Sequence, residues 1–159
     1  MWIEARSNVH AINTEAVGLE GWLDIDMGDH KITGLDSQGR VEFAVANLKS
    51  GNTMEDRELQ RRIDARNHPT ISGDLRAMRA TTEPLRYLVS GDVTFRGVTR
   101  TYEDEMTLQN IDDRTVGLTG ESTFDIRDFG MQPPRILLLK VHPEVVVRVE
   151  VIAQESPPV

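Results

Sequence analysis

Apolar and polar residues alternate one by one over most of this chain, so its dominant period is two. The alternation returns over 116–124 and over 145–151, where valine occupies every second position. A period of two is typical of antiparallel strands that have one buried and one solvated face. The pattern therefore predicts an all-β protein. Its clearest example places Tyr87, Val89, Gly91, Val93 and Phe95 on one side of a strand.

Eight segments show this pattern, and the connections between them are short and contain turn residues such as Arg96-Gly97 and Asp112-Asp113. A flat sheet of eight strands would have two exposed edges, and closing it into a barrel removes both. An eight-stranded barrel either fills with side chains or holds one small ligand. An open β-sandwich has the same periodicity and is the alternative. The expected strands are 4–13, 17–26, 39–47, 70–80, 85–96, 98–109, 114–125 and 144–153.

One segment, residues 53–65, departs from the alternation. It consists of helix formers, with acids early, arginines late, and Leu59 and Ile63 one turn apart as an apolar stripe. Asn52 or Thr53 is placed to cap its first turn. The segment predicts a single α-helix of three turns. Its arginines alternate with acids, which favours a solvated helix face over a nucleic-acid surface.

Length and charge narrow the possible classes of protein. The 159 residues suit a single domain, which we place at 1–153 with a flexible tail at 154–159. The 26 acids outnumber the 18 bases, and a net charge of −8 argues against nucleic acid as a partner. The longest apolar runs are too short to span a bilayer, so no integral membrane association is expected. The first residues lack a secretory signal, which predicts a cytoplasmic protein, or a periplasmic or exported one if a leader has been removed.

The residue types that carry most catalytic chemistry are missing or scattered. The chain has no cysteine, and His10, His30, His68 and His142 lie far apart, so we expect no metal site and no cofactor. His68 and His142 each precede a proline, which indicates a structural role. No serine has a base and an acid at triad spacing, so no catalytic residue and no enzyme are predicted.

Two further patterns have simple interpretations. The tripeptide Asp128-Phe129-Gly130 is found in protein kinases, but the phosphate-binding and catalytic loops of kinases are absent. Asp92 and Arg96 fall on one face of the same expected strand, which predicts a salt bridge between them.

Four motifs stand out between residues 48 and 130: Leu48-Lys49-Ser50-Gly51-Asn52, His68-Pro69-Thr70-Ile71, Ser90-Gly91-Asp92-Val93-Thr94-Phe95-Arg96-Gly97-Val98-Thr99 and Phe124-Asp125-Ile126-Arg127-Asp128-Phe129-Gly130. In this order and spacing, they resemble the YceI-like family of lipid-binding β-barrels. The resemblance implies an extended lipocalin-like barrel around a long apolar channel, with a polyisoprenoid or fatty-acid-like molecule as ligand. It also implies that two barrels could pair as a homodimer, although no segment specifies an interface.

The leading hypothesis is binding, storage or transport of an apolar, lipid-like small molecule in the barrel interior, driven by burial of apolar surface. The residues expected to contact it are inward-facing and apolar, with Phe129 and Met131 as a rim or lid. A small barrel enzyme of isomerase or cyclase type would instead place an ionisable group with a shifted pKa at an inward position. A filled barrel acting as an interaction module would have no cavity. The expected ligand-binding residues are Leu19, Leu23, Phe43, Val45, Tyr87, Val89, Val93, Phe95, Leu118, Phe124, Phe129 and Met131.

Overall fold

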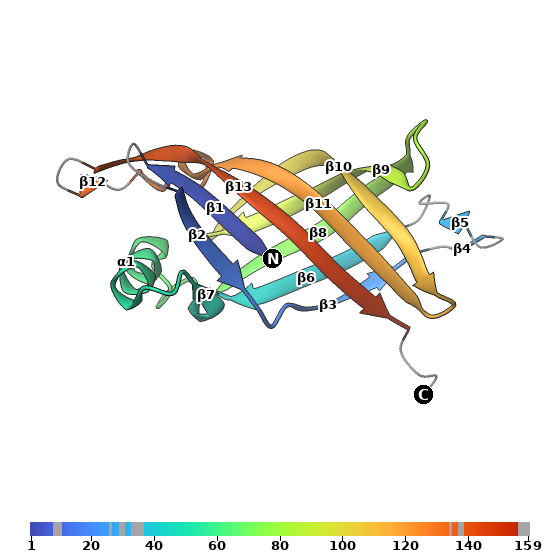
Figure 1. The fold of residues 1–159 in the computed structure, drawn as a ribbon, viewed down its shortest axis with the longest axis horizontal. Helices are drawn as coiled ribbons and strands as arrows, with labels where there is room; N and C mark the ends of the chain where they lie inside the picture. Colours follow the sequence, from blue (N-terminus) through green and yellow to red (C-terminus); the bar gives the residue numbers. More distant parts are fainter. Residues whose placement is uncertain are drawn as a thin grey trace.

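The computed structural model describes residues 1–7, 11–25, 27–28, 31–32, 37–133, 135–136 and 139–155. These ranges form a long antiparallel sheet that curls on itself, with one α-helix at one end (Figure 1). The elements are β1 (Trp2–Ser7), β2 (Ala11–Ala16), β3 (Glu20–Asp24), β4 (Met27–Gly28), β5 (Lys31–Ile32), β6 (Gln38–Ala44), the 3-10 helix η1 (Val45–Asn47), β7 (Leu48–Lys49), α1 (Thr53–Ile63), β8 (Thr70–Ala80), β9 (Arg86–Phe95), β10 (Val98–Asp112), β11 (Thr115–Asp125), the 3-10 helix η2 (Ile126–Phe129), β12 (Arg135–Ile136) and β13 (Leu139–Gln154).

The sheet closes through two interrupted strands. Its hydrogen-bonded order is β3-β6-β8-β9-β10-β11-β13-β1-β2-β7. In the chain, β3 follows β2 and β7 follows β6, and β2 pairs with β7 while β3 pairs with β6. Strands β2 and β3 are two parts of one interrupted strand, and β6 and β7 are two parts of another. When each interrupted strand is counted once, the ten strands occupy eight positions around the described barrel. The predicted eight-stranded barrel is confirmed, and an open sandwich is excluded.

Several predicted strand limits are wrong, mostly near the N-terminus. The strand expected at 4–13 is divided, since β1 ends at Ser7 and β2 begins at Ala11. Alternation continues on both sides of a hairpin, so the pattern alone does not locate the turn. The strand expected at 39–47 ends at Ala44, and Val45 begins η1. Both β10 and β13 are longer than expected, and the short β4–β5 pair was not expected.

At the C-terminal end, strand β13 extends one residue past the predicted domain limit of 153. Gln154 ends β13 and pairs with Thr115 of β11. The Glu155 carboxylate pairs with Arg114 at 3.0 Å. The rest of the predicted tail, 156–159, lies outside the described residues.

The helix forms where the sequence predicts it, two residues shorter at its C-terminal end. The Asn52 side chain accepts hydrogen bonds from the backbone N–H groups of Met54 and Glu55, which confirms Asn52 as the cap. The chain leaves the helix at Asp64, whose φ of 59° is in the left-handed region. On the solvated side, Arg61 and Arg62 both bond Glu58 and lower the pKa of its carboxyl group to about 2. The predicted charged, solvated face is therefore present.

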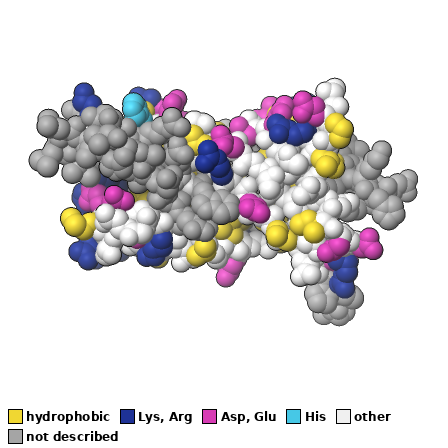
Figure 2. Space-filling model, viewed as in Figure 1, with side chains coloured by type: hydrophobic (Ala, Val, Ile, Leu, Met, Phe, Trp, Pro, Cys, Tyr) yellow, Lys and Arg dark blue, Asp and Glu magenta, His cyan; other side chains and the backbone are white. Residues whose placement is uncertain are grey.

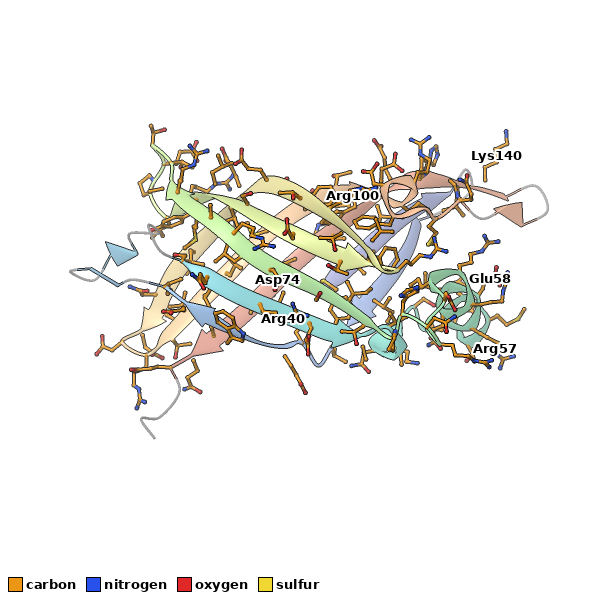
Figure 3. The ribbon with its side chains drawn as sticks, turned by 180° about the vertical axis from the view of Figure 1, so that it is seen from behind. Arg40, Arg57, Glu58, Asp74, Arg100 and Lys140 are labelled. Atoms are coloured by element: carbon orange, nitrogen blue, oxygen red, sulfur yellow. The ribbon has the colours of Figure 1, made fainter. Side chains whose placement is uncertain are left out.

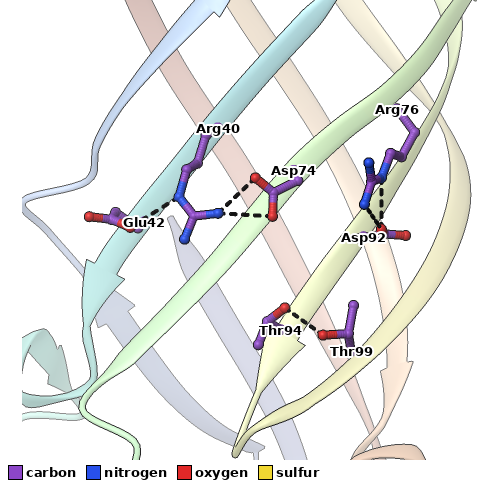
Figure 4. A network of polar contacts seen from close by, with 7 residues as sticks. All are labelled: Arg40, Glu42, Asp74, Arg76, Asp92, Thr94 and Thr99. Carbon is purple, nitrogen blue, oxygen red and sulfur yellow. Dashed lines mark hydrogen bonds and ion pairs between the residues drawn. The ribbon is translucent and has the colours of Figure 1, made fainter.

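The outer surface of the barrel carries cross-strand pairs of charged and polar side chains. Figure 2 shows acidic and basic side chains interspersed over one face of the molecule. On β6 and β8, the Arg40 guanidinium contacts both carboxylate oxygens of Asp74 at 2.8 and 3.0 Å (Figures 3 and 4). Such exposed pairs contribute little each, about 0–1 kcal/mol, but they add polar groups to the outer face of the strands that carry them.

The predicted salt bridge between Asp92 and Arg96 is wrong. Asp92 instead accepts hydrogen bonds from Arg76 at 2.7 Å and from Thr101 at 2.6 Å, on the two neighbouring strands. These contacts lower the pKa of Asp92, the Thr101 hydroxyl most strongly and then Arg76. Arg96 follows the last residue of β9 with a φ of 52°, and its guanidinium donates to the Phe129 carbonyl at 3.3 Å. The positive φ takes Arg96 out of the strand alternation on which the prediction rested.

Candidate ligand-binding site

The inward face of the sheet is largely apolar and lines a continuous, partly open cavity. Its register puts inward residues of neighbouring strands side by side, as in the row Val41, Gly73 and Val93 across β6, β8 and β9. The cavity has a volume of about 2330 Å³ and is lined from α1 at one end to Arg114 in the β10–β11 turn at the other. With its 11 residues at about 3.3 Å each, β11 measures about 36 Å, or about 28 Å along the axis of a barrel tilted by about 40°. The cavity is therefore long enough for an extended chain molecule.

Side chains pack tightly near the two ends of the barrel rather than in its middle. At the α1 end, Ile63 of the helix packs in one cluster with Phe43, Val45, Leu48, Ile126 and Met131. At the opposite end, a second cluster consists of Met78, Tyr87 and Leu108. Figure 1 shows α1 and the β10–β11 turn at these opposite ends.

Several inward positions between the clusters are glycines, which include Gly73, Gly91 and Gly120. Gly73 and Gly91 line the cavity, and Gly120 pairs with Met106 and Val149, which also line it. A glycine contributes no side chain to the interior, but of these three only Gly73 leaves room for one. An ideal Cβ would lie 2.9 Å from the Asp74 backbone oxygen at Gly91 and 2.7 Å from the Met106 side chain at Gly120. An ideal Cβ at Gly73 would lie 3.4 Å from the nearest atom, Cγ1 of Val41, which is ordinary contact. At Gly73 the open space therefore results from the missing side chain, because the surrounding atoms would leave room for a larger residue.

An aromatic group forms the wall near the α1 end. The Phe95 and Phe129 rings meet edge to face with centroids 5.4 Å apart. Tyr102 meets Phe124 edge to face at 4.6 Å and stacks with Phe129 at 6.1 Å. These are the favourable arrangements for aromatic pairs. The group fixes the shape of the cavity wall at this end.

Tyr102 brings a polar tip to this aromatic wall. Its hydroxyl lies 3.4 Å from Oδ2 of Asp128 in η2. Burial, and secondly the Asp128 carboxylate, raises the pKa of Tyr102 to about 12. The phenol is therefore protonated at neutral pH and serves as a hydrogen-bond donor.

A second polar pair lies on the cavity wall, on β10 and β11. The Ser122 hydroxyl hydrogen-bonds to Oδ2 of Asp104, and both residues line the cavity. The sequence interpretation did not single out Asp104. Its position could have been inferred, because Tyr102, Asp104, Met106 and Leu108 occupy alternate positions of one strand. The signal in the sequence was an acid at a position where the alternation predicts an apolar, inward-facing residue.

The structure brings together ten of the twelve expected ligand-binding residues on the cavity wall. Val45 and Tyr87 differ, since both are buried in the end clusters and do not border the cavity. Val45 is fully buried because η1 turns it away from the strand pattern. Phe129 and Met131, expected as a rim or lid, are buried at the α1 end of the cavity. The ten are Leu19, Leu23, Phe43, Val89, Val93, Phe95, Leu118, Phe124, Phe129 and Met131.

The cavity wall also includes residues that were not selected from the sequence. The valines of β13 had been recognised as one face of a strand, but only the register with β11 shows that this face is inward. Leu75 and Met78 both border the cavity because a bulge between Leu75 and Ala77 shifts the alternation. The additional apolar residues include Met1, Ile3, Ile25, Val41, Leu59, Ile71, Leu75, Met78, Met106, Val145, Val147, Val149 and Val151.

Other site types find no support in the described residues. Within them, no group of three or more His, Cys, Asp or Glu side chains is placed to hold a metal ion. His10 and His30 lie outside the described residues, and the His68 ring packs against the Gly97 turn. No helix in the described ranges has the length and apolarity to cross a membrane.

The sequence matches the YceI-like domain over residues 5–153. The chain belongs to the YceI-like family. Among curated proteins, none matches the sequence. The barrel is similar to Burkholderia cenocepacia BcnA, with a TM-score of 0.78, 16% identity and 96% of each chain covered. It is also similar to the Campylobacter jejuni YCEI protein, with a TM-score of 0.75, 15% identity, and 92% of this chain and 86% of that one covered.

A third solved structure is similar over almost the full length. It is a polyisoprenoid binding domain from Saccharophagus degradans implicated in plant cell wall breakdown, with a TM-score of 0.74 and 8% identity. The match covers 98% of this chain and 94% of that domain. At these identities the comparisons establish the YceI-like fold that the sequence motifs indicated.

Proposed function

We propose that this YceI-like protein binds a long apolar or amphiphilic molecule, of polyisoprenoid or fatty-acid-like type, in its barrel for storage or transport. The observation that carries the proposal is the continuous cavity of about 2330 Å³, lined mainly by Val, Leu, Ile, Met and Phe. Pockets for drug-sized ligands measure about 300–1,000 Å³, so this cavity suits a larger molecule. The similar Saccharophagus degradans domain, described as polyisoprenoid binding, supports the same ligand class.

The energetics also favour a long ligand. Burial of apolar surface contributes roughly 25 cal/mol per Å², so a chain that buries about 400 Å² gains roughly 10 kcal/mol. Association costs an estimated 4–15 kcal/mol in lost freedom. The gain grows with the apolar area buried while this cost stays nearly constant, so a chain that follows the cavity from end to end offsets the cost better than a short apolar ligand.

Binding explains the site better than catalysis or a purely structural barrel. The enzyme hypothesis requires an inward ionisable group with a shifted pKa, and Tyr102 has one. Its pKa is raised, however, so the phenol stays protonated and is a poor general base near neutral pH. The interaction-module hypothesis requires a filled barrel, which the cavity opposes.

The proposal is tested by uptake of a polyprenol into protein from which bound lipid has been extracted, measured by native mass spectrometry. We expect stoichiometric uptake by the wild type. Gly73→Leu places a side chain in the open middle, where the position tolerates a Cβ, and should weaken uptake at least tenfold. Thr119→Leu adds the same residue at an exposed position of β11 that faces outward, and should leave uptake unchanged. Absence of uptake by the wild type, or equal uptake by Gly73→Leu and wild type, would contradict the proposal.

A further inference from the structure

Asp104 and Ser122 form a polar pair on an otherwise apolar stretch of the cavity wall. Asp104 of β10 lies opposite Val89 of β9, and Ser122 of β11 lies opposite Val147 of β13. The Ser122 hydroxyl donates to Oδ2 of Asp104, and the Ser122 side chain is buried. Both residues border the cavity, so the pair faces the space that a ligand would occupy.

The cavity is open beside this pair. The inward neighbours of Asp104 along β10 are Tyr102 and Met106, and each lies opposite a glycine on the adjacent strand. These glycines are Gly91 and Gly120. The Met106 side chain covers Gly120, whereas Gly91 has only backbone atoms of Asp74 and Leu75 as its nearest neighbours. A ligand in the cavity therefore reaches Asp104 from the Gly91 side.

The Asp104 carboxylate has acceptor capacity beyond its bond to Ser122. Within the described part of the chain, Ser122 is the hydrogen-bond partner of Asp104, and no Lys or Arg forms an ion pair with it. An ionised carboxylate has two acceptor oxygens and no donor. Placing one on an apolar wall is costly unless it is paired. The group that complements it must donate a hydrogen bond.

A packing role alone would not require an acid at this position. The neighbouring acids of β10, Glu103 and Glu105, project outward, where they pair with Arg79 and Arg86. Asp104 instead interrupts the inward series of Tyr102, Met106 and Leu108. A threonine or asparagine could bond the Ser122 hydroxyl without bringing a charge into the cavity.

We propose, building on the proposed lipid-binding function, that Asp104 and Ser122 form a subsite for the head group of an amphiphilic chain that donates a hydrogen bond, a hydroxyl or an amine. The Asp104 carboxylate accepts the bond from the ligand. The same carboxylate repels a carboxylate or phosphate at this position. The subsite thus selects long-chain alcohols or amines over fatty acids.

The test is a competition among four probes of equal chain length: hexadecan-1-ol, hexadecylamine, hexadecanoic acid and hexadecane. Lipid-extracted protein is incubated with the equimolar mixture, and the bound fraction is extracted and quantified. A hydrogen bond to a charged group is strong enough that we expect the wild type to retain the alcohol, the amine or both at least about tenfold over the acid. Preference for the alcohol identifies a hydroxyl as the recognised donor, and preference for the amine identifies an ammonium.

Three variants make the result specific to Asp104. Asp104→Asn replaces one acceptor by a donor, so the preference over the acid should fall to near one. Asp104→Leu should also abolish the preference and raise the retention of hexadecane. The matched control is Glu103→Gln, which removes an outward acid from the adjacent position of the same strand and should keep the wild-type preference. Retention of hexadecane by every variant reports that the barrel and its cavity are intact.

Two outcomes would overturn the inference in distinguishable ways. If the wild type and Asp104→Asn take up hexadecane and retain acid, alcohol and amine equally, the subsite is wrong and the lipid-binding function stands. If the wild type takes up none of the four probes, the lipid-binding function itself fails, and the subsite fails with it.

Discussion

Two polar residues on the cavity wall, Tyr102 and Asp104, keep their polar atoms in a largely apolar interior by different means. Tyr102 buries its ring between Phe124 and Phe129 and points its hydroxyl toward Asp128 at the end of the barrel. Among the described residues, the short Ser122 side chain is the one hydrogen-bond partner of the Asp104 carboxylate. Tyr102 therefore belongs to the packed wall, whereas Asp104 retains an acceptor for a ligand.

The pKa of Tyr102 leads to a prediction at the residue scale. Because the folded protein raises this pKa from 10.0 to about 12, it favours the protonated phenol. The corresponding part of the stability is fully present below pH 10 and is lost as the pH rises from 10 to about 12. Tyr102→Phe keeps the ring and removes the hydroxyl, so its urea midpoint should fall less than that of the wild type between pH 9 and 11.5. Circular dichroism of both proteins measures this, and parallel curves would contradict it.

At the scale of elements, the turn of the β9–β10 hairpin contacts His68, which lies in the segment between α1 and β8. The turn residues Arg96 and Gly97 both have positive φ, 52° and 72°, as a two-residue hairpin of matching twist requires. The turn packs on His68, and an ideal Cβ at Gly97 would lie only 2.7 Å from its ring. Gly97 is thus constrained by both backbone and packing.

This double constraint predicts a difference between two glycine substitutions. Gly97→Ala should cost about 1–2 kcal/mol for the left-handed backbone and more for the contact with His68. Gly51→Ala has a similar φ of 86°, but no atom lies within 4 Å of the added Cβ, so it should incur only the backbone cost. Urea denaturation should therefore show the larger loss for Gly97→Ala. In the Gly97→Ala background, His68→Ala should recover stability only if the ring contact is the cause.

At the scale of the whole molecule, the barrel is packed at its ends and open between them. The cluster around Ile63 closes in on the α1 end, and the cluster of Met78, Tyr87 and Leu108 packs the opposite end. In the middle of the barrel, the inward apolar side chains are only partly buried, because they face the cavity. A bound chain would complete the burial of these residues.

This arrangement predicts that ligand and stability are linked. A molecule that binds only the folded barrel stabilises it by about 2.7 kcal/mol when its free concentration is 100 times Kd. Extraction of bound lipid should lower the unfolding midpoint, and addition of the extracted fraction should restore it. Thermal denaturation across a ligand titration measures the effect. Gly73→Leu should show a smaller shift, and a midpoint that ignores saturating ligand would contradict binding inside the barrel.

Much of this fold follows from short-range patterns. Alternation in 87–95, 116–124 and 145–151 identifies strands and their two faces, and Asn52 marks the start of α1, because both features act within a few residues. The same alternation placed Val89, Val93 and Phe95 on the inward side, where they line the cavity. It did not distinguish an open interior from a filled one.

The remaining features depend on contacts between distant residues. The bulge after Leu75 and the turn of the chain at Val45 change which side chains face inward, and neither leaves a signal in the alternation. Asp104 and Ser122 meet only because β10 and β11 pair in this register. The amino-acid sequence by itself determined the strands, the helix and the polarity of each strand face, since these are local preferences. Only the tertiary structure decided closure through β2 and β7, the volume inside and the polar pair on its wall, since these depend on register and on how distant segments pack.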